Sequence, residues 1–394
     1  MKKLSLVLAI ALTTGQMFAQ TINKTKFGKG LKFMSEDSSF TMKFHYRQQQ
    51  LFIGEFNDVT EKQSANFMVR RSRLKFSGYA FTPKLTYKAE IGLTGRDIST
   101  SSEDKFGSGS SRLILDAVLK YKFADHWSVW VGQTKLPGNR ERVISSADLQ
   151  FVDRSMVNSK FNIDRDMGLQ LRGKYKMGKM VLKPSFAITQ GQGRDVTKGN
   201  TGGLDYTAHL DILPLGAFSS KKGDYTSSDL DREEKPKIAF GFTYDYNDRV
   251  VRQGGQGKKY VKDATSGDLV TNSLSTFMAD LIFKYKGVSI LSEYITKSAE
   301  HERIGTSHKF NTGSGFNFQM GYLFKSNWEI ASRFTTILND GKFSGLKDQE
   351  EYTIGLSKYI VGHKLKLQSD ISKIETFGIK DDVYRVRMQM EMQF

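Results

Sequence analysis

The sequence predicts an all-β protein, a transmembrane antiparallel β-barrel of about 16 strands, a size that leaves an aqueous channel. The clearest observation is the last segment, in which apolar and polar side chains alternate strictly up to Phe394. A period of two gives a strand one face for lipid and one for water. Similar runs recur along the chain, and the connections between them are alternately short and long. The apolar members of the last run are Tyr384, Val386, Met388, Met390, Met392 and Phe394.

The first residues predict export. Lys2 and Lys3 form a basic start, residues 4–12 are apolar, and cleavage after Ala19 would give a signal peptide over residues 1–19. The apolar stretch is too short to cross a bilayer as a helix, although a retained N-terminal anchor is the alternative. We therefore expect a periplasmic segment over residues 20–39 and a barrel over residues 40–394, in the outer membrane of a Gram-negative bacterium.

The rest of the chain is predicted to be one continuous domain. It has 394 residues but only 5 prolines, and no Pro-rich or Ser-rich stretch that would act as a linker. The mean hydropathy of -0.44 does not exclude a membrane protein, because every second residue of a barrel strand faces away from lipid. The absence of cysteine excludes a disulfide framework and a lipoprotein cysteine.

Alternating runs and their connections set the predicted topology. Short turns at one end and long loops at the other are typical of an outer-membrane barrel with both termini in the periplasm. Residues 214–236 break the rule, because a long polar stretch stands where a short turn is expected. The main runs cover residues 40–46, 74–80, 85–93, 113–121, 167–175, 180–188, 206–210, 238–244, 277–283, 316–322, 352–356, 365–371 and 384–394. Short connections fall at 82–84, 124–125, 177–178, 286–287, 325–327 and 361–362, and long ones near 55–65, 96–110, 137–165, 191–203, 247–273, 299–312 and 339–349.

The strand positions opposite the apolar stripes predict the chemistry of the lumen. Lys and Arg outnumber Asp and Glu there by about three to one, as the rings of cations in anion pores require. The net charge of +17 agrees. Lysines beside the short turns, such as Lys122, Lys176 and Lys286, have a simpler explanation, which is contact with headgroups and lipopolysaccharide phosphates. The predicted lumen cations include Lys43, Arg47, Arg71, Arg73, Lys75, Lys120 and Arg172.

One group of lumen cations is crowded. Arg71, Arg73 and Lys75 lie on the same face of one predicted strand, so their charges repel unless an anion or a carboxylate is close. Both explanations remain open, and the first makes this trio a candidate anion path.

The segment 137–165 is the candidate constriction. It is long for a loop, and residues 141–158 have helical spacing of apolar side chains. Folded inward, it would bring Arg140, Arg142 and Arg154 to the narrowest point, where guanidinium groups match the oxygens of phosphate. Neighbouring carboxylates nearly balance these charges, so the alternative is that salt bridges merely hold the loop against the wall.

Other chemistries find no support in the sequence. The 6 histidines show no His-x-x-x-His spacing, and His301 and His308 form only a loop pair. The acidic residues 229–234 are interleaved with Arg, which favours a solvated segment over a calcium site. The glycines of 254–257 precede no Lys-Ser or Lys-Thr pair, so they do not predict a phosphate-binding loop. We expect no enzymatic activity, no metal, no cofactor and no nucleic-acid partner.

Several stretches resemble the phosphate-selective porin O and P family over nearly all of the mature chain. The resemblance implies a 16-stranded trimeric barrel whose third extracellular loop folds inward, with arginines and lysines guiding phosphate or polyphosphate. By position it carries over only Arg71, Arg73 and Arg154. The acidity of 214–236 departs from an ordinary turn and argues against a purely anion-friendly periplasmic mouth. The stretches are 70–78 (RRSRLKFSG), 131–135 (VGQTK), 151–158 (FVDRSMVN), 165–169 (RDMGL), 284–287 (KYKG) and 292–294 (SEY).

Two functional hypotheses follow. The first is a passive outer-membrane diffusion channel that prefers inorganic anions, with phosphate or polyphosphate as the candidate solute. The second is a structural or docking barrel in a larger envelope assembly, with its pore plugged by loops. In either case the expected partners are outer-membrane lipid, lipopolysaccharide, further copies in a homotrimer, and the barrel assembly machinery, for which Phe394 is the predicted signal.

Overall fold

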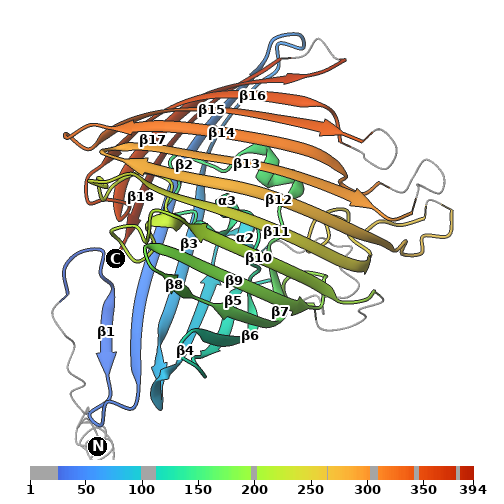
Figure 1. Ribbon diagram of the computed structural model, residues 1–394. Helices are drawn as coiled ribbons and strands as arrows, with labels where there is room; N and C mark the ends of the chain where they lie inside the picture. The colour runs from blue at the N-terminus through green and yellow to red at the C-terminus, as the bar shows by residue number, and fades with distance from the viewer. Residues whose placement is uncertain are drawn as a thin grey trace, which may run out of the picture.

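The computed structural model describes residues 25–98, 112–196, 202–263, 265–301, 309–340, 346–378 and 382–394. Within them the chain forms a closed ring of 16 antiparallel strands, each hydrogen-bonded to two neighbours (Figure 1). The predicted all-β class and strand number are confirmed. No helix in these ranges has the length and apolar content needed to cross a bilayer.

The wall strands follow the order of the chain, and the last strand closes against the first. β7 and β8 are consecutive pieces of one wall strand, because both pair with β9. The short β1 adds to the start of β2, beyond the end of β18. The strands are β1 (Leu31–Met34), β2 (Thr41–Asn57), β3 (Gln63–Ala80), β4 (Thr82–Gly92), β5 (Ile114–Tyr121), β6 (Trp127–Lys135), β7 (Arg165–Gly173), β8 (Tyr175–Met177), β9 (Met180–Thr189), β10 (Asp205–Leu213), β11 (Lys237–Val250), β12 (Asn272–Tyr285), β13 (Val288–Ala299), β14 (Gly313–Leu323), β15 (Trp328–Asn339), β16 (Gln349–Tyr359), β17 (Leu365–Thr376) and β18 (Val383–Gln393).

The alternation of side chains explains the two faces of the wall. In β18, Met388 and Met390 are exposed on the outside, whereas Gln389 between them is buried inside the ring. The residue after this strand completes the seam, because the main chain of Phe394 exchanges two hydrogen bonds with Tyr46 of β2, of 3.0 and 2.9 Å. The two rings also pack with their centroids 5.6 Å apart.

The two ends of the barrel differ as the topology predicts. At the end that holds Phe394, called here the terminal end, most hairpins are tight, as at Lys286 and Gly287 between β12 and β13. At the opposite end, the loop end, the connections are long. One predicted turn is misplaced, because the chain reverses at Phe81, with a positive φ of 63°, and β4 already begins at Thr82.

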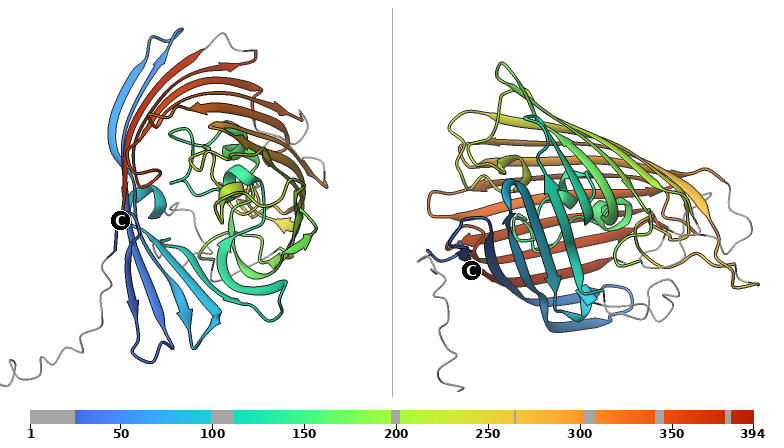
Figure 2. Two further views of the ribbon diagram at one scale, coloured as in Figure 1. Left: turned by 60° about the vertical axis from the view of Figure 1, so that its left-hand side comes forward. Right: turned by 90° about the horizontal axis from the view of Figure 1, so that it is seen from below.

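Two long segments lie inside the ring of strands, as Figure 2 shows in the view down the barrel. One is the segment 137–165 from the loop end, and the other is the segment 214–236 from the terminal end. The first contains only α3 (Arg140–Val143) and α4 (Met156–Phe161), and the second contains η1 (Gly223–Tyr225). A further short helix, α2 (Gly95–Ile98), follows β4.

The expected helical run over residues 141–158 is therefore wrong for its middle part. There the wall supplies the hydrogen bonds that a helix would make internally: Gln368 donates to the carbonyl of Gln150 (2.8 Å), and Asp370 accepts from the N–H of Val152 (3.1 Å). Partners from β17 thus replace helical ones, which sequence spacing alone does not reveal.

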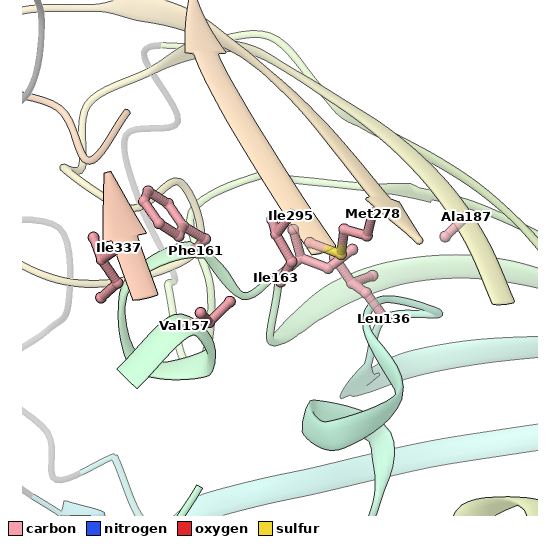
Figure 3. Close-up of a cluster of buried hydrophobic side chains, with 8 residues drawn as sticks. All are labelled: Leu136, Val157, Phe161, Ile163, Ala187, Met278, Ile295 and Ile337. Carbon is pink, nitrogen blue, oxygen red and sulfur yellow. The ribbon is translucent and has the colours of Figure 1, made fainter. Parts of the chain in front are cut away.

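The hydrophobic core lies inside the barrel, between these segments and one side of the wall. Val157 and Phe161 of α4 belong to a buried cluster that also contains wall residues such as Met278 and Ile295 (Figure 3). A second cluster joins the two inner segments, with Ile144 from one and Phe218 from the other. The inner faces of β9 to β17 are therefore largely covered.

Candidate functional site

A large cavity lies beside the uncovered part of the wall. Its volume is about 1430 Å³, and it is lined mainly by β2 to β7, by flanking residues of the two inner segments and by the start of β18. Its lining contains about twice as many Lys and Arg as Asp and Glu. The candidate site is therefore an off-centre, basic passage along the wall.

Arg140 explains why the passage is off-centre. Its guanidinium is almost fully buried and forms ion pairs of 2.6 Å with Asp211 of β10 and with Asp280 of β12. It also donates to the main-chain carbonyl of Asp224 at 2.8 Å. One side chain of the segment 137–165 thus joins two wall strands and the other inner segment. Arg140 does not line the cavity.

Glycines on the inward face of the wall make room for the segment 137–165. A Cβ at Gly315 of β14 would lie 2.8 Å from the side chain of Val157, and one at Gly355 of β16 would lie 3.0 Å from Phe151. A larger residue at either place would force the segment away from the wall. Close approach of the backbone is therefore built into the sequence of the strands.

The segment 214–236 is held just as firmly. Lys284 of β12 donates from its Nζ to the carbonyls of Gly223 (2.8 Å) and Ser228 (2.9 Å). The two inner segments also touch directly, because the N–H of Ser227 donates to the carbonyl of Asp148 at 3.0 Å.

Two acidic side chains of this segment accept hydrogen bonds inside the barrel. Asp229 accepts from the N–H of Gly287 (2.8 Å), and Glu233 accepts from the N–H and the hydroxyl of Ser219 (both 2.7 Å). Both carboxyls are buried, whereas Lys221 and Lys222 line the cavity. The expectation that this segment places acidity at the mouth is therefore wrong for these two carboxyls.

At the loop end, the cavity arginines are matched with carboxylates. A bulge in β3 leaves Arg70 without a partner on β2, so Arg70 and the next residue, Arg71, both face inward. Both bind Asp153 of the segment 137–165, at 2.9 and 3.2 Å. Burial alone would raise the pKa of the Asp153 carboxyl, but Arg71 and Arg70 hold it well below its ordinary value.

The next cations toward the terminal end are also paired with carboxylates. Arg73 binds Asp97 (2.7 Å) and Glu90 (3.3 Å). Arg142 is paired with Asp164. The sequence left two explanations open for the crowded trio, and for Arg71 and Arg73 the structure supplies carboxylates. Lys88 and Arg165 follow the pattern, since both bind Asp116, at 2.8 and 3.0 Å.

Two further cations of the passage are held by main-chain carbonyls. Arg154 donates to the carbonyls of Glu141 (2.8 Å) and Ile144 (2.6 Å), and it lines the cavity. Lys135 of β6 likewise donates to the carbonyls of Arg142 (2.7 Å) and Ile144 (3.1 Å). Carbonyl oxygens carry only a partial charge, so the full charge of each cation is not cancelled.

Nearer the terminal end, the lining has cations without carboxylate partners. Within the described ranges, Lys75 forms no ion pair, and neither do Lys120 of β5 and Arg172 of β7. Both of the latter instead lie against the indole ring of Trp130 in β6. The terminal half of the passage therefore also carries positive charges that no ion pair among the described residues offsets.

The remaining predicted site residues lie elsewhere. Arg47 is buried against Glu391 (2.6 Å) and donates to Ser146 of the segment 137–165 (2.8 Å), outside the cavity lining. Lys43 lies at the start of β2, where it pairs in register with Lys32 of β1. Of the predicted anion-path residues, the cavity thus brings together Arg71, Arg73, Lys75, Arg142 and Arg154, and the predicted lumen cations Lys120 and Arg172 line it too.

Two features of the lining were not predicted from the sequence. Arg70 was not among the predicted lumen cations, because strict alternation cannot reveal a bulge. Trp130 was not singled out, although its position opposite the apolar residues Val129 and Val131 places it on the inward face. No group of three or more His, Cys, Asp or Glu side chains within the described ranges is arranged to hold a metal ion.

Comparison with known proteins agrees with this architecture. A protein of Aquifex aeolicus (strain VF5), described as uncharacterized, is 23% identical over 368 residues, which are 86% of this chain and 82% of that protein. The outer membrane channel DcaP of Acinetobacter baumannii superposes with a TM-score of 0.55 and 13% identity, over 92% of this chain and 99% of DcaP.

A second solved structure is similar to the same degree. The anion-selective porin from Comamonas acidovorans gives a TM-score of 0.51 with 10% identity, over 90% of this chain and 100% of that porin. At such identities these likenesses show the fold alone. The model of the family described as phosphate-selective porin O and P matches residues 41–394, nearly the whole chain. The chain therefore belongs to the phosphate-selective porin O and P family and is an outer-membrane porin.

Proposed function

We propose that the protein is a passive diffusion channel that prefers anions. The single observation that carries this proposal is the cavity of about 1430 Å³, whose terminal half has Lys75, Lys120 and Arg172, none of which forms an ion pair in the described ranges. Uncompensated cations on a water-filled wall raise the local concentration of anions and repel cations.

Phosphate is the solute that the lining favours. Guanidinium and ammonium groups donate several hydrogen bonds to oxyanions, which chloride cannot accept in the same geometry. At the loop end, Arg71, Arg73 and Arg142 share their donors with carboxylates, so an entering oxyanion meets partly satisfied groups and is held weakly. Weak holding suits transport, because a tightly bound solute cannot leave.

The membrane setting completes the proposal. Residues 1–19 act as the export signal, although they lie outside the described residues. The terminal end, with its tight hairpins, faces the periplasm, and the segment 137–165 enters from the cell exterior to narrow the channel. Phe394 serves as the assembly signal, and the barrel functions as a homotrimer in contact with lipopolysaccharide.

A potassium chloride gradient across a planar bilayer tests the channel function. With purified protein in the bilayer, the reversal potential should have the sign of chloride permeation. Reversal of the opposite sign would reject anion preference.

The contact between the two inner segments, from Ser227 to Asp148, favours a second candidate function. A barrel filled from both ends suits a docking or structural role in a larger envelope assembly. The same bilayer measurement separates the two, since a plugged barrel would give no steady conductance.

A further inference from the structure

We propose that Lys120, Trp130 and Arg172 form a discrete binding site for a multiply charged oxyanion such as phosphate. The site lies on three adjacent wall strands, in the terminal half of the cavity. It rests on the proposed channel function, and it adds a defined stopping point along the path.

The three side chains are in direct contact. Lys120 of β5 is the register partner of Trp130 in β6, and its Nζ lies 3.5 Å from the centroid of the indole ring. Arg172 comes from β7 on the other side, with its Cζ 4.7 Å from the same centroid. Two cations thus approach one ring from the two strands that flank it. The ring N–H donates to Ser128 at 3.1 Å, which fixes the indole along its strand.

The electrostatics of the ring favour an anion beside it. An aromatic ring is negative on its faces and positive at its edge. Cations prefer the faces, so Lys120 and Arg172 occupy the places where an anion would be repelled. The positive edge of the Trp130 ring and the two cations therefore all attract an anion in the cavity.

A neutral partner distinguishes this site from the rest of the lining. Asp153 binds both Arg70 and Arg71, and one negative charge is thereby set against two positive charges. The indole ring also holds its two cations in place, but it is neutral and so does not reduce their positive charge. The second partner of Arg172 is also neutral, because its Nε and Nη2 both donate to the amide oxygen of Gln170, at 3.1 and 2.6 Å.

The chemical class of the ligand follows from these donors. The Nζ of Lys120 and the Nη1 of Arg172 are not used in hydrogen bonds within the described ranges, so both can donate to one solute. Lys75, without an ion pair in those ranges, lines the same cavity. Two or more fixed charges with directed N–H donors match a divalent oxyanion better than a halide. Inorganic phosphate is the appropriate probe.

Phosphate block of the chloride current through single channels tests the site. In the wild-type protein, added inorganic phosphate should reduce the current as it occupies the site. Trp130→Leu and Lys120→Met should each raise the phosphate concentration for half block by about fivefold or more, which corresponds to loss of a desolvated cation–π contact or of one fixed charge. Trp130→Phe keeps a π face and should retain most of the block.

The outer wall offers a matched control. Lys358 lies 5.2 Å from the ring centroid of Trp328, and neither residue lines the cavity. Trp328→Leu and Lys358→Met therefore remove the same kind of contact outside the passage, and they should leave the phosphate block unchanged. The heat-shift of the folded barrel on a gel confirms that each variant is assembled. If Trp130→Leu does not assemble, Lys120→Met and Arg172→Met carry the test.

The outcomes separate this inference from the channel function itself. If the wild-type channel is anion-selective but shows no phosphate block, the binding site is overturned and the channel function stands. The same holds if the phosphate block in Lys120→Met and Arg172→Met equals that of the wild type. Cation selectivity or absence of conductance in the wild-type protein overturns the proposed function before any variant is compared.

Discussion

Arg140 and Asp280 are joined inside the barrel by a fully buried ion pair of 2.6 Å, although they are 140 positions apart in the sequence. The pair fixes the start of the segment 137–165 to β12. Asp211 accepts from the same guanidinium, so removal of Arg140 would leave two buried carboxylates without their cation.

Arg140→Met should therefore loosen the inner segment without opening the wall. Breaking one side of a buried ion pair costs about 3–5 kcal/mol. We expect a larger and noisier single-channel conductance and faster cleavage of the segment by added protease. Arg142→Met is the control, because its partner Asp164 is partly exposed and its loss should have a smaller effect. Equal conductance of Arg140→Met and wild type would show that this ion pair does not position the segment.

Gly315→Val should destabilise the folded protein by about 1–3 kcal/mol, the usual cost of overpacking. The new Cβ would lie 2.8 Å from Val157, against the cluster around α4. Thermal loss of the heat-modifiable band measures the change. Gly95→Val, where no atom lies within 4 Å of the added Cβ, should melt like the wild type. A lower melting point for both would indicate a general effect of valine.

Asp153→Asn should increase the preference for anions. The amide cannot carry the charge that now offsets Arg70 and Arg71, so the loop end of the passage becomes more positive. The reversal potential in a potassium chloride gradient should move closer to the chloride equilibrium potential. Glu234→Gln changes the same charge at an exposed position of the segment 214–236, and it should shift the potential less. The reverse order would place Asp153 outside the ion path.

Lys284→Met should release the segment 214–236 at the terminal end. Its Nζ donates to two carbonyls of that segment, which would be left without partners. Lost hydrogen bonds to a charged donor cost about 1.5–3 kcal/mol each. We expect protease from the terminal side to cut the segment faster. Lys286→Met serves as the comparison, because the side chain of this lysine lies over the ring of Tyr285 and the substitution keeps its main-chain contact with the segment. Cleavage at the wild-type rate in Lys284→Met would contradict the role assigned to Lys284.

Phe394→Ser should lower the amount of assembled barrel in the outer membrane while synthesis continues. Two contributions must be separated, because the ring of Phe394 also packs on Tyr46. Tyr46→Leu removes that ring contact and keeps the terminal aromatic. Assembly should fall in Phe394→Ser and remain near normal in Tyr46→Leu; an equal fall in both would assign the effect to packing of the seam.

The strands of the wall were largely predictable from the sequence, because the alternation of apolar and polar residues depends only on neighbouring positions in the chain. Alternation between lipid and water placed Arg71, Arg73 and Lys75 on the inner face, where the structure has them. The rule fails where the backbone departs from a regular strand. The bulge at Arg70 adds one residue to β3, and nothing in the alternation marks it.

The partners of the cations were not predictable in the same way. Asp153 is 82 positions from Arg71, and its choice among several acidic residues depends on how the segment 137–165 crosses the barrel. The segment 214–236 resembled a solvated loop, because its polar groups give no sign that Lys284 and Gly287 will satisfy them once they are buried. Interior polar networks are therefore visible only in three dimensions.

The covered side of the barrel also constrains the order in which the chain can mature. Many of the residues that receive the segment 137–165, such as Asp280, Gly315 and Asp370, follow it in the sequence, with Asp370 218 positions beyond Val152. Contacts of such long range cannot form on a nascent fragment, and they slow folding through the entropy of loop closure. A chain that lacks β12 to β17 would expose Val157, Phe161 and an unneutralised Arg140. Water can be excluded from the hydrophobic clusters only after the last third of the polypeptide has joined the ring. An incomplete barrel would therefore be the species most prone to aggregation and degradation.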